Sequence, residues 1–281
     1  MKNTTFDDLK GKVCVITGGA GVIGSALAEG LGHAGVKVAI LDINEELASK
    51  AAENVKKVTG TEAAGFKANV LDKASLIEAR KNVNARFGNI EFLINGAGGN
   101  SPKATTQVEQ ITDINELDKS FFGLEMEAFD KVFALNFTGT LLPTMVFAEE
   151  MLKRHKGVIL NISSMNSFRP LTKIPAYSAA KASVNNFTQW LAVHLAKTGI
   201  RVNAIAPGFF LTNQNRFLLT DEKTGAPTAR GLKIIANTPV GKYGTPEDLQ
   251  GATLFLLSDI SQFINGIILP VDGGYSAYGG V

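Results

Sequence analysis

The sequence predicts one α/β domain with a doubly wound parallel sheet of seven strands and helices on both faces. Three observations lead to this fold class. Short apolar runs alternate with longer amphipathic segments through about seven repeats, which favours parallel strands covered on both faces. The 281 residues, 45% of them hydrophobic, suit one large core rather than two full domains. The glycine-rich and polar motifs follow the apolar runs, where the carboxyl ends of parallel strands bring them together.

The first half of the chain alternates regularly between short and long segments. The short ones are apolar and bounded by glycines or polar residues, as buried strands are. They cover residues 12–17, 37–42, 63–70 and 90–99, the last of which runs into a glycine turn. Segments with helical periodicity connect them, over residues 18–35, 43–57 and 73–87.

The second half continues the alternation but contains two long insertions. Thr245 is the expected N-cap of the last helix, with Pro246 at its first position. The insertions, at about 98–124 and 207–245, show no clear periodicity. Long loops in a compact domain are usually functional, so we expect both to face a substrate. Strands are expected over 157–162, 200–208 and 266–277, and helices over 125–155, 176–198 and 245–258.

Composition and charge exclude several classes of protein. The net charge is +2 and no basic tract occurs, so there is no electrostatic footprint for nucleic acid or an anionic membrane. The single cysteine, Cys14, cannot form an internal disulfide and is expected to be a small buried hydrophobe. No N-terminal signal and no run near the eighteen apolar residues of a membrane span is visible. We therefore expect a cytoplasmic protein without nucleic-acid or membrane partners, and we identify no metal ligands.

A glycine motif follows the first predicted strand. Gly19, Gly21 and Gly24 form a G-x-G-x-x-G between that strand and the first helix. Such glycines let the backbone approach a pyrophosphate at a helix N-terminus. The motif therefore predicts a dinucleotide site, against the alternative of a merely tight turn. The expected cradle comprises Gly18, Gly19, Gly21, Val22, Ile23 and Gly24.

An acidic residue, Asp42, ends the second predicted strand eighteen residues after Gly24. A carboxylate there can accept both hydroxyls of an adenosine ribose and repels a 2′-phosphate. The sequence therefore favours NAD(H) over NADP(H). The alternative is that Asp42 only caps the following helix, a role that Asn44 fills equally well.

A tyrosine and a lysine, Tyr177 and Lys181, are one helical turn apart if a helix opens at Pro175. A free phenol has a pKa of about 10 and is a poor base at neutral pH. A cation about 5 Å away supplies roughly 3 kcal/mol, which lowers the phenol pKa toward the working range. Ser164, at the end of the preceding strand, can then hydrogen-bond a substrate oxygen that shares its proton with Tyr177. Because Tyr-x-x-x-Lys is a weak signal by itself, an exposed tyrosine beside a solvated lysine is the alternative.

Together these residues give the chain a resemblance to the short-chain dehydrogenase/reductase family across nearly its whole length. In that family a serine precedes the catalytic tyrosine by thirteen residues, as Ser164 does here, and an asparagine lies on the preceding long helix, as Asn136 does in LNFTGT. The resemblance implies a Rossmann-type fold and a catalytic tetrad of Asn136, Ser164, Tyr177 and Lys181. It also implies that Asn136 holds a water in contact with the lysine. The family is commonly tetrameric, so a homotetramer or homodimer is expected.

Other residues match positions that bind the cofactor in this family. In the family motif Thr-Gly-x-x-x-Gly-x-Gly, Thr17, Gly18 and Gly24 match, while Val22 stands where glycine is usual. The family's Asn-Asn-Ala-Gly turn is present with Gly96 in place of the second Asn. The resemblance implies further cofactor contacts from Asn69, Val70, Asn95, Ala97, Gly98, Pro207, Gly208, Phe210 and Thr212, together with Tyr177 and Lys181.

The insertions and the loop between Ser164 and Tyr177 are rich in amides and cations. Arg can grip a carboxylate bidentately, and amides match vicinal hydroxyls, so this composition predicts a sugar-acid substrate. The alternative is an apolar slot lined by phenylalanines, among them Phe168 and Phe209. The candidate substrate residues are Asn100, Lys103, Asn166, Arg169, Asn213 and Arg216, of which Lys103 and Arg169 are the candidates for the carboxylate.

Three sequence segments indicate a particular subgroup of this family. GAGGNSPKATT, SSMNSFRPLTKIPAYSAAK and APGFFLTNQNR resemble the short-chain type of D-mannonate oxidoreductase (fructuronate reductase). That resemblance implies interconversion of D-fructuronate and D-mannonate in hexuronate breakdown. Two alternatives remain open. One is the same enzyme class acting on a gluconate-type sugar acid, a polyol or a 3-oxoacyl thioester, and the other is a dinucleotide-binding regulator that has lost catalysis.

Overall fold

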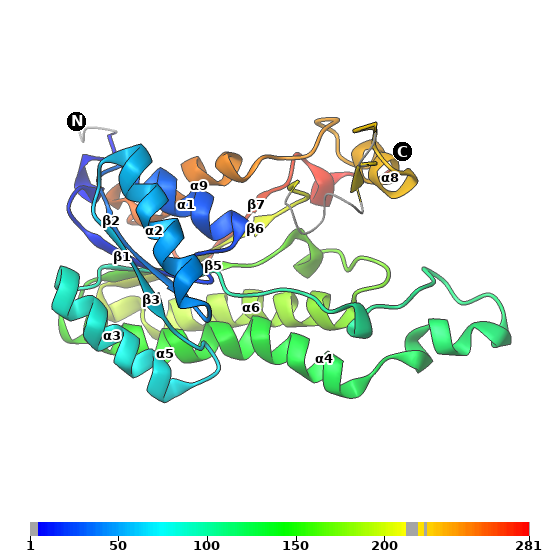
Figure 1. The fold of residues 1–281 in the computed structure, drawn as a ribbon, viewed down its shortest axis with the longest axis horizontal. Helices are drawn as coiled ribbons and strands as arrows, with labels where there is room; N and C mark the ends of the chain where they lie inside the picture. The colour runs from blue at the N-terminus through cyan, green and yellow to red at the C-terminus, as the bar shows by residue number, and fades with distance from the viewer. Residues whose placement is uncertain (1–4, 212–218, 222–223, 281) are drawn as a thin grey trace.

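Seven parallel strands form the centre of the computed structural model, which describes residues 5–211, 219–221 and 224–280 (Figure 1). Their order is β3-β2-β1-β4-β5-β6-β7, so the winding direction reverses between β1 and β4. The predicted fold class is confirmed. The strands are β1 Val13–Thr17, β2 Lys37–Asp42, β3 Ala63–Lys67, β4 Phe92–Asn95, β5 Gly157–Ile162, β6 Ile200–Pro207 and β7 Ile268–Val271.

Helices cover both faces of this sheet. In Figure 1, α1, α2 and α9 lie on one side, and α3, α5 and α6 lie on the other. Each side has its own apolar core, because strands β1, β4 and β5 are buried on both faces and send alternate side chains into each layer. The helices are α1 Val22–His33, α2 Glu45–Thr59, α3 Lys73–Phe87, α4 Met126–Phe133, α5 Gly139–Lys153, α6 Pro175–His194, α8 Ala229–Ala236 and α9 Gln250–Leu257.

Among the predicted boundaries that differ from the structure, two have a visible local cause. Strand β3 ends at Lys67 rather than at residue 70, because the Asn69 side chain accepts a hydrogen bond from Leu71 N (3.0 Å) and turns the chain toward α3. Helix α6 ends at His194 rather than at residue 198. A short 3₁₀ turn follows and Gly199 adopts a positive φ of 78°, which stops the helix. The predicted start of the last helical segment is confirmed: Thr245 precedes Pro246 as the N-cap.

The long helix predicted over 125–155 is interrupted by a wider turn. Between α4 and α5, residues Ala134–Thr138 form a π-helical turn in which Gly139 N donates to Ala134 O. An extra residue in a helical turn rotates the side chains that follow and is common at functional sites. The turn contains Asn136, so the tetrad asparagine lies at this irregularity.

The combined helix Met126–Lys153 is long and apolar enough, by length and composition, to cross a membrane. The expectation from the sequence concerned a continuous run of about eighteen apolar residues, and this helix contains none. Scattered charged residues such as Asp130 and Glu149 break the uninterrupted apolar runs without removing the helix's apolar character. Phe147 and Met151 on this helix are fully buried in the core beneath the sheet, so we assign the helix to the core.

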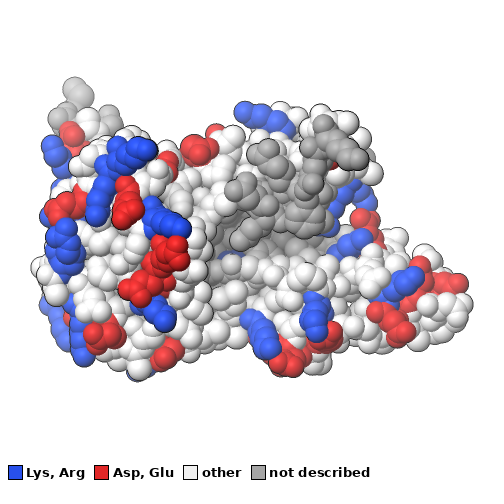
Figure 2. Space-filling view, in the orientation of Figure 1, with Lys and Arg blue, Asp and Glu red and all other residues white. Residues whose placement is uncertain are grey.

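The two insertions lie beyond the carboxyl end of the sheet. The first extends past the start of α4 (Figure 1) and contains three short 3₁₀ segments. The second carries α8. An ion pair joins them, with Lys233 Nζ of α8 lying 2.6 Å from Glu109 Oε2. Figure 2 shows a hollow in the surface between the sheet and the segment that carries α8.

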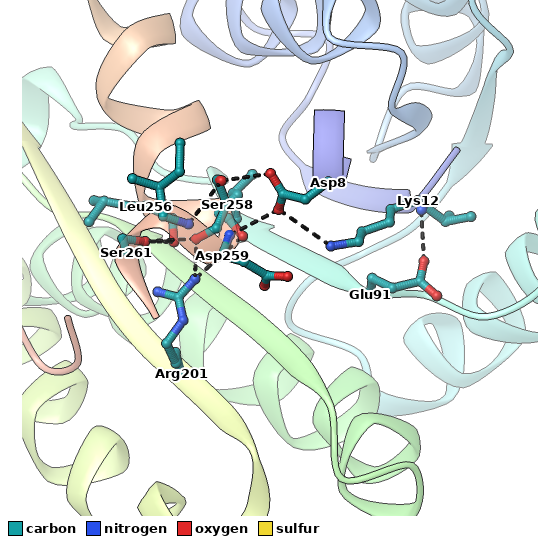
Figure 3. Close-up of polar contacts among 11 residues, drawn as sticks. Asp8, Lys12, Glu91, Arg201, Leu256, Ser258, Asp259 and Ser261 are labelled. Carbon is teal, nitrogen blue, oxygen red and sulfur yellow. Dashed lines mark hydrogen bonds and ion pairs between the residues drawn. The ribbon is translucent and has the colours of Figure 1, made fainter. Parts of the chain in front are cut away.

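A polar cluster closes the opposite, amino-terminal edge of the sheet (Figure 3). Asp8 accepts hydrogen bonds from Ser258 Oγ (2.8 Å) and Asp259 N (2.9 Å). Lys12 lies 3.6 Å from the same carboxylate, and Arg201 donates to the carbonyl of Ser258 (3.1 Å). The cluster therefore joins the N-terminal segment, β6 and the end of α9, and its cations are engaged within the protein.

Candidate active site

The predicted catalytic residues come from two adjoining elements. Ser164 follows the end of β5 by two residues. Pro175 opens α6, which places Tyr177 in its first turn and Lys181 one turn later. The Tyr177 hydroxyl lies within reach of the Ser164 side chain, which acts to lower the phenol pKa, and Ser164 Oγ accepts from Asn166 N at 3.2 Å. The structure therefore brings the serine and the tyrosine together as predicted.

Lys181 lies beneath this pair and is nearly inaccessible, with 4% of its surface exposed. Its Nζ donates to the carbonyl of Ile162 at 2.7 Å and lies 5.7 Å from the centre of the Tyr177 ring. Burial lowers the pKa of Lys181 to about 8, because a charged ammonium is poorly solvated there. Lys181 can therefore lose its proton at a mildly alkaline pH.

The pKa of Tyr177 moves in the direction opposite to the one expected from the sequence. Burial raises it, and the hydrogen bond with Ser164 offsets part of the rise. The sequence argument considered only the attraction of a neighbouring cation. In the folded protein both groups are desolvated, which disfavours the phenolate and the ammonium alike. Tyr177 is therefore held protonated at neutral pH, the form in which it can donate a proton.

Asn136 is fully buried and clamps the turn after β4. Its Nδ2 donates to the carbonyls of Gly99 (2.7 Å) and Val132 (2.8 Å), and its Oδ1 accepts from Gly99 N (3.2 Å). A Cβ atom added at Gly98 would lie 2.6 Å from Asn136 Oδ1 and 3.3 Å from Lys181 Nζ. The asparagine, the glycine turn and the lysine therefore adjoin one another, and the amide of Asn136 is already occupied by protein groups.

The glycine turn after β1 is closed too tightly for side chains. Gly18 has a φ of +62°, and a Cβ there would lie 2.7 Å from Ala97 Cα; one at Gly24 would lie 2.6 Å from Gly18 O. Thr17 Oγ1 accepts from Gly96 N (3.1 Å) and Ala97 N (3.3 Å). The turns that follow β1 and β4 are therefore held side by side.

Helix α1 begins at Val22 with Gly21 as its N-cap, directly beyond this turn. The first N–H groups of a helix have no partner within the helix and carry partial positive charge. Val22, Ile23 and Gly24 supply these groups here, and Gly21 is exposed beside them. The residues present therefore fit the pyrophosphate of a dinucleotide, with Val22 in the first turn of the helix although the family usually has glycine there.

Asp42 is not needed as the N-cap of α2, the alternative role that the sequence left open. Asn44 is the N-cap of α2 and its Oδ1 accepts from Leu47 N (3.1 Å). Asp42 ends β2 and is partly exposed, and within the described residues its carboxylate accepts a hydrogen bond only from Asn44 N (3.1 Å). Asn69 and Val70 follow β3 next to this edge. A nucleotide bound at the glycine turn can therefore reach these three residues.

The other predicted cofactor residues follow one another in the sequence at and after the end of β6. Gly208 approaches the backbone closely, since a Cβ there would lie 2.6 Å from Asp272 Cα; it follows Pro207, the last residue of β6. Phe210 is buried in the core. Thr212 lies outside the described residues. The sequence-based assignment therefore keeps Pro207 and Gly208 at the edge of the site, while the Phe210 ring packs inward.

Asn95 is the predicted cofactor residue that the structure places elsewhere. Its side chain is buried between sheet and helix, and its Nδ2 donates to Thr144 Oγ1 and Asn161 Oδ1, both at 2.8 Å. The amide points into the protein because Asn95 is the last residue of β4 and faces α5. We therefore correct its role to support of the sheet beneath the site.

The two predicted substrate residues of the first insertion have partners on the surface. Lys103 Nζ pairs with Glu125 Oε2 at 3.2 Å, and its side chain is largely exposed. Asn100 Nδ2 donates to Thr105 Oγ1 at 2.9 Å. These contacts hold the insertion in its own conformation, so Lys103 is not preorganised as a carboxylate ligand.

The predicted substrate residues in the loop between Ser164 and Tyr177 keep unused hydrogen-bonding groups, unlike those of the first insertion. Asn166 is 5% exposed, and its Oδ1 has no hydrogen-bond partner within the described part of the chain. Arg169 donates to the main-chain carbonyl of Tyr278 and is otherwise exposed. Asn166 therefore carries a free acceptor next to the serine, and Arg169 has further donors available. The predicted substrate residues Asn213 and Arg216 lie outside the described residues.

Sequence reasoning missed three polar residues behind the serine. Ser163, Ser167 and Asn185 are connected by hydrogen bonds that end on the carbonyl of Ser164. The available signal was the spacing of Asn185, which lies one turn after Lys181 on α6. Ser163 precedes Tyr177 by fourteen residues rather than the thirteen of the family serine.

Comparison with known proteins agrees with this geometry. Residues 12–223 match the family model for short chain dehydrogenases. An uncharacterized oxidoreductase of Haemophilus influenzae is 51% identical over 276 residues, covering 98% of this chain and 96% of the relative. A candidate D-mannonate oxidoreductase from Haemophilus, solved with bound NAD, superposes with a TM-score of 0.92 at 51% identity and covers 97% of this chain and 98% of its own.

A more distant relative has a sugar-acid substrate in its name. The 5-keto-D-gluconate 5-reductase of Escherichia coli strain K12 is 34% identical over 266 residues, covering 95% of this chain and 96% of the relative. The family match spans the glycine turn, the serine, the tyrosine and the lysine described above. The chain therefore belongs to the short-chain dehydrogenase family.

Proposed function

We propose that this oxidoreductase binds NAD(H) and interconverts a keto sugar acid with its hydroxy acid, specifically D-fructuronate with D-mannonate. The observation that carries the proposal is the contact between the Ser164 and Tyr177 hydroxyls above buried Lys181, next to the glycine turn. It supports hydride chemistry because a proton donor and a second hydroxyl converge where the cofactor cradle ends.

The residues perform distinct parts of the reaction. Bound NADH would supply hydride to the carbonyl carbon. Tyr177, held protonated by burial, donates its proton to the carbonyl oxygen, and Ser164 hydrogen-bonds the same oxygen as negative charge develops there. Lys181 can return a proton toward Tyr177 and would hold the ribose of a bound nucleotide, roles suited to an ammonium whose pKa is about 8. Asn136 fixes the turn that adjoins the lysine.

The proposed substrate is supported by two relatives and by the loop after Ser164. The Haemophilus protein is described as a candidate D-mannonate oxidoreductase, and the Escherichia coli relative reduces 5-keto-D-gluconate by name. Both names refer to sugar acids with several hydroxyls, D-mannonate being the hydroxy form of such a pair and 5-keto-D-gluconate the keto form of another. The free Asn166 acceptor and the remaining Arg169 donors suit a hydroxyl and a carboxylate. We propose Arg169, rather than the paired Lys103, as the carboxylate ligand.

The direct test is the initial rate of NADH oxidation with a panel of carbonyl compounds. D-fructuronate should give the highest kcat/KM. D-fructose, which has no carboxylate, should be poorer by roughly tenfold or more if Arg169 binds that group. 5-Keto-D-gluconate and a 3-oxoacyl thioester complete the panel. A higher kcat/KM for either would discard fructuronate, and equal values for fructose and fructuronate would discard the carboxylate contact.

Asp42→Ala is expected to reduce the preference for NADH over NADPH by roughly 10- to 100-fold, since two hydrogen bonds to a charged group are lost and repulsion of a 2′-phosphate is removed. The ratio of kcat/KM values for the two cofactors measures this change. Glu46→Ala removes a nearby exposed charge of the same sign and should leave the ratio unchanged. An unchanged ratio in the Asp42 variant would contradict the proposal that its carboxylate binds the adenosine ribose.

We propose that the chain assembles as a homotetramer, or a homodimer, through the outer face of α6. That face is uncharged from Ala179 to Val193 apart from buried Lys181, and it exposes Trp190 (57%) and Val193 (78%). Val193→Glu should therefore lower the molar mass measured by light scattering, because it introduces a charge into an apolar contact. Val58→Glu, at an exposed valine on α2, is the control. An unchanged mass would reject this face.

The remaining partner proposals follow from the charge distribution. On the face drawn in Figure 2, lysines and arginines are interspersed with acidic residues rather than gathered in one patch. Such a surface lacks the basic stripe that a nucleic acid or an anionic membrane requires. We therefore keep a small-molecule substrate as the proposed partner and the cytoplasm as the proposed location.

A further inference from the structure

A chain of hydrogen bonds ends on the main chain of Ser164. Ser163 Oγ donates to Asn185 Oδ1 at 2.5 Å. Asn185 Nδ2 donates to Ser167 Oγ at 2.7 Å. Ser167 Oγ donates to the main-chain carbonyl of Ser164 at 2.5 Å. Ser163 Oγ also lies 3.2 Å from Ser167 Oγ, so the shorter bonds through Asn185 are accompanied by a longer direct one. The chain ends on the backbone of the residue whose hydroxyl faces Tyr177.

Asn185 is the member that connects two elements. Ser163, Ser164 and Ser167 belong to the turn that follows β5, whereas Asn185 belongs to α6, one turn beyond Lys181. Both polar atoms of its amide are hydrogen-bonded, because Oδ1 accepts from Ser163 and Nδ2 donates to Ser167. A side chain with only an acceptor or only apolar atoms cannot make both bonds. Asn185 is therefore one of the side chains that tie the turn to α6, beside the bond from Ser163 Oγ to the Lys181 carbonyl (3.5 Å) and the bond from Lys181 Nζ to the Ile162 carbonyl (2.7 Å).

The Ser164 hydroxyl is oriented by the same turn. Ser164 is extended, with φ −163° and ψ 154°, and caps the short 3₁₀ segment Met165–Ser167. Its Oγ accepts from Asn166 N at 3.2 Å, which leaves its own hydrogen for Tyr177 or a substrate oxygen. This bond lies within the turn that Ser167 closes. Greater mobility of Ser167 should therefore also make the Ser164 hydroxyl more mobile.

We propose that Asn185 is a positioning residue, which holds Ser164 in its reactive orientation through Ser167 and couples that orientation to the helix that carries Tyr177 and Lys181. The inference rests on the proposed reductase function for its kinetic consequence. Asn185 restrains Ser164 whichever substrate the enzyme uses, so this part of the inference is independent of the proposed function. Small misplacements of a catalytic group are costly, so the restraint affects rate more than binding.

Asn185→Leu should lower kcat by roughly 10- to 100-fold with little change in the dissociation constant of NADH, measured by fluorescence titration. Asn185→Asp keeps the volume and the acceptor for Ser163 but lacks the donor to Ser167, so it should lose a similar factor. Asn84→Leu makes the same change on α3, where Asn84 contacts Glu150, and should leave kcat unchanged. Full activity in the Asp variant would show that packing alone is required and would overturn the proposal.

The dependence on Ser164 is tested in the Ser164→Ala background. Because Asn185 acts only through the serine, adding Asn185→Leu there should change the residual single-turnover rate by less than about twofold, a strong departure from additivity. The same fold-loss in both backgrounds would show that Asn185 supports the site in some other way and would overturn the proposal.

A measurement without turnover separates this inference from the proposed function. Ser164→Cys places a thiol at the serine position, and the natural Cys14 is fully buried with its thiol pKa raised by burial, so it does not compete for alkylation. Adding Asn185→Leu should change the alkylation rate by iodoacetamide about fivefold or more, whereas adding Asn84→Leu should not. Equal rates would overturn the inference. A wild-type enzyme that reduces no compound of the panel would instead contradict the proposed function, and the alkylation rates would still decide the role of Asn185.

Discussion

Tyr177→Phe is expected to lower kcat for the reduction by roughly 10²- to 10⁴-fold while leaving the affinity for NADH unchanged. The variant removes one hydroxyl that lies against Ser164 and keeps the ring that packs against α4. Stopped-flow oxidation of NADH gives the rate, and fluorescence titration gives the affinity. Tyr243→Phe removes a buried hydroxyl without a partner within the described residues and should keep the rate. A Tyr177 variant of full activity would exclude it as the proton donor.

The direction of the tyrosine pKa predicts how the two reaction directions depend on pH. Burial holds the pKa of Tyr177 above its ordinary value, so the phenol stays protonated through neutral pH. Reduction, which needs the proton, should stay fast across that range. Oxidation, which needs the phenolate to accept a proton, should accelerate as the pH rises. Equal pH profiles in both directions would contradict this assignment.

Lys181→Met should abolish most of the activity and yet stabilise the protein without nucleotide at neutral pH. The activity falls because the variant has no ammonium near Tyr177. The stability rises because the wild-type fold carries the cost of a buried charge. With a pKa near 8 in the folded state and about 10.4 unfolded, that cost is about 3 kcal/mol. The variant also loses the hydrogen bond to the Ile162 carbonyl, which reduces the expected gain in stability by about 1 kcal/mol.

The pH dependence of this stabilisation has a definite sign. Below pH 8 the lysine is charged in both states, so the burial cost is fully present. Between pH 8 and about 10.4 the folded state has released the proton while the unfolded state still binds it, so wild-type stability rises with pH. The melting temperature of Lys181→Met should therefore exceed that of the wild type at pH 7, and the difference should shrink toward pH 10. A variant less stable at pH 7 would show that the hydrogen bond outweighs the desolvation.

Local sequence was enough to predict much of the molecule. Apolar runs of strand length separated by helical segments predicted the parallel sheet, because periodicity and the need for buried backbone to pair are encoded residue by residue. The spacing of Tyr177 and Lys181 and the glycines after β1 also follow from local geometry. A helical turn and a backbone in close approach require particular residues at particular intervals.

Contacts between distant segments were decided only by the tertiary structure. The polar side chain of Asn95 could face a cofactor or the core, and packing against α5 turned it inward. The π-helical turn at Asn136 and the rise in the Tyr177 pKa depend on the surroundings that other elements supply. Asn185 shows the same limit: its residue type and spacing are visible in the sequence, but its bond to Ser167 exists only because α6 packs against the turn after β5. Desolvation and long-range hydrogen bonding are properties of the assembled fold, so no local pattern contains them.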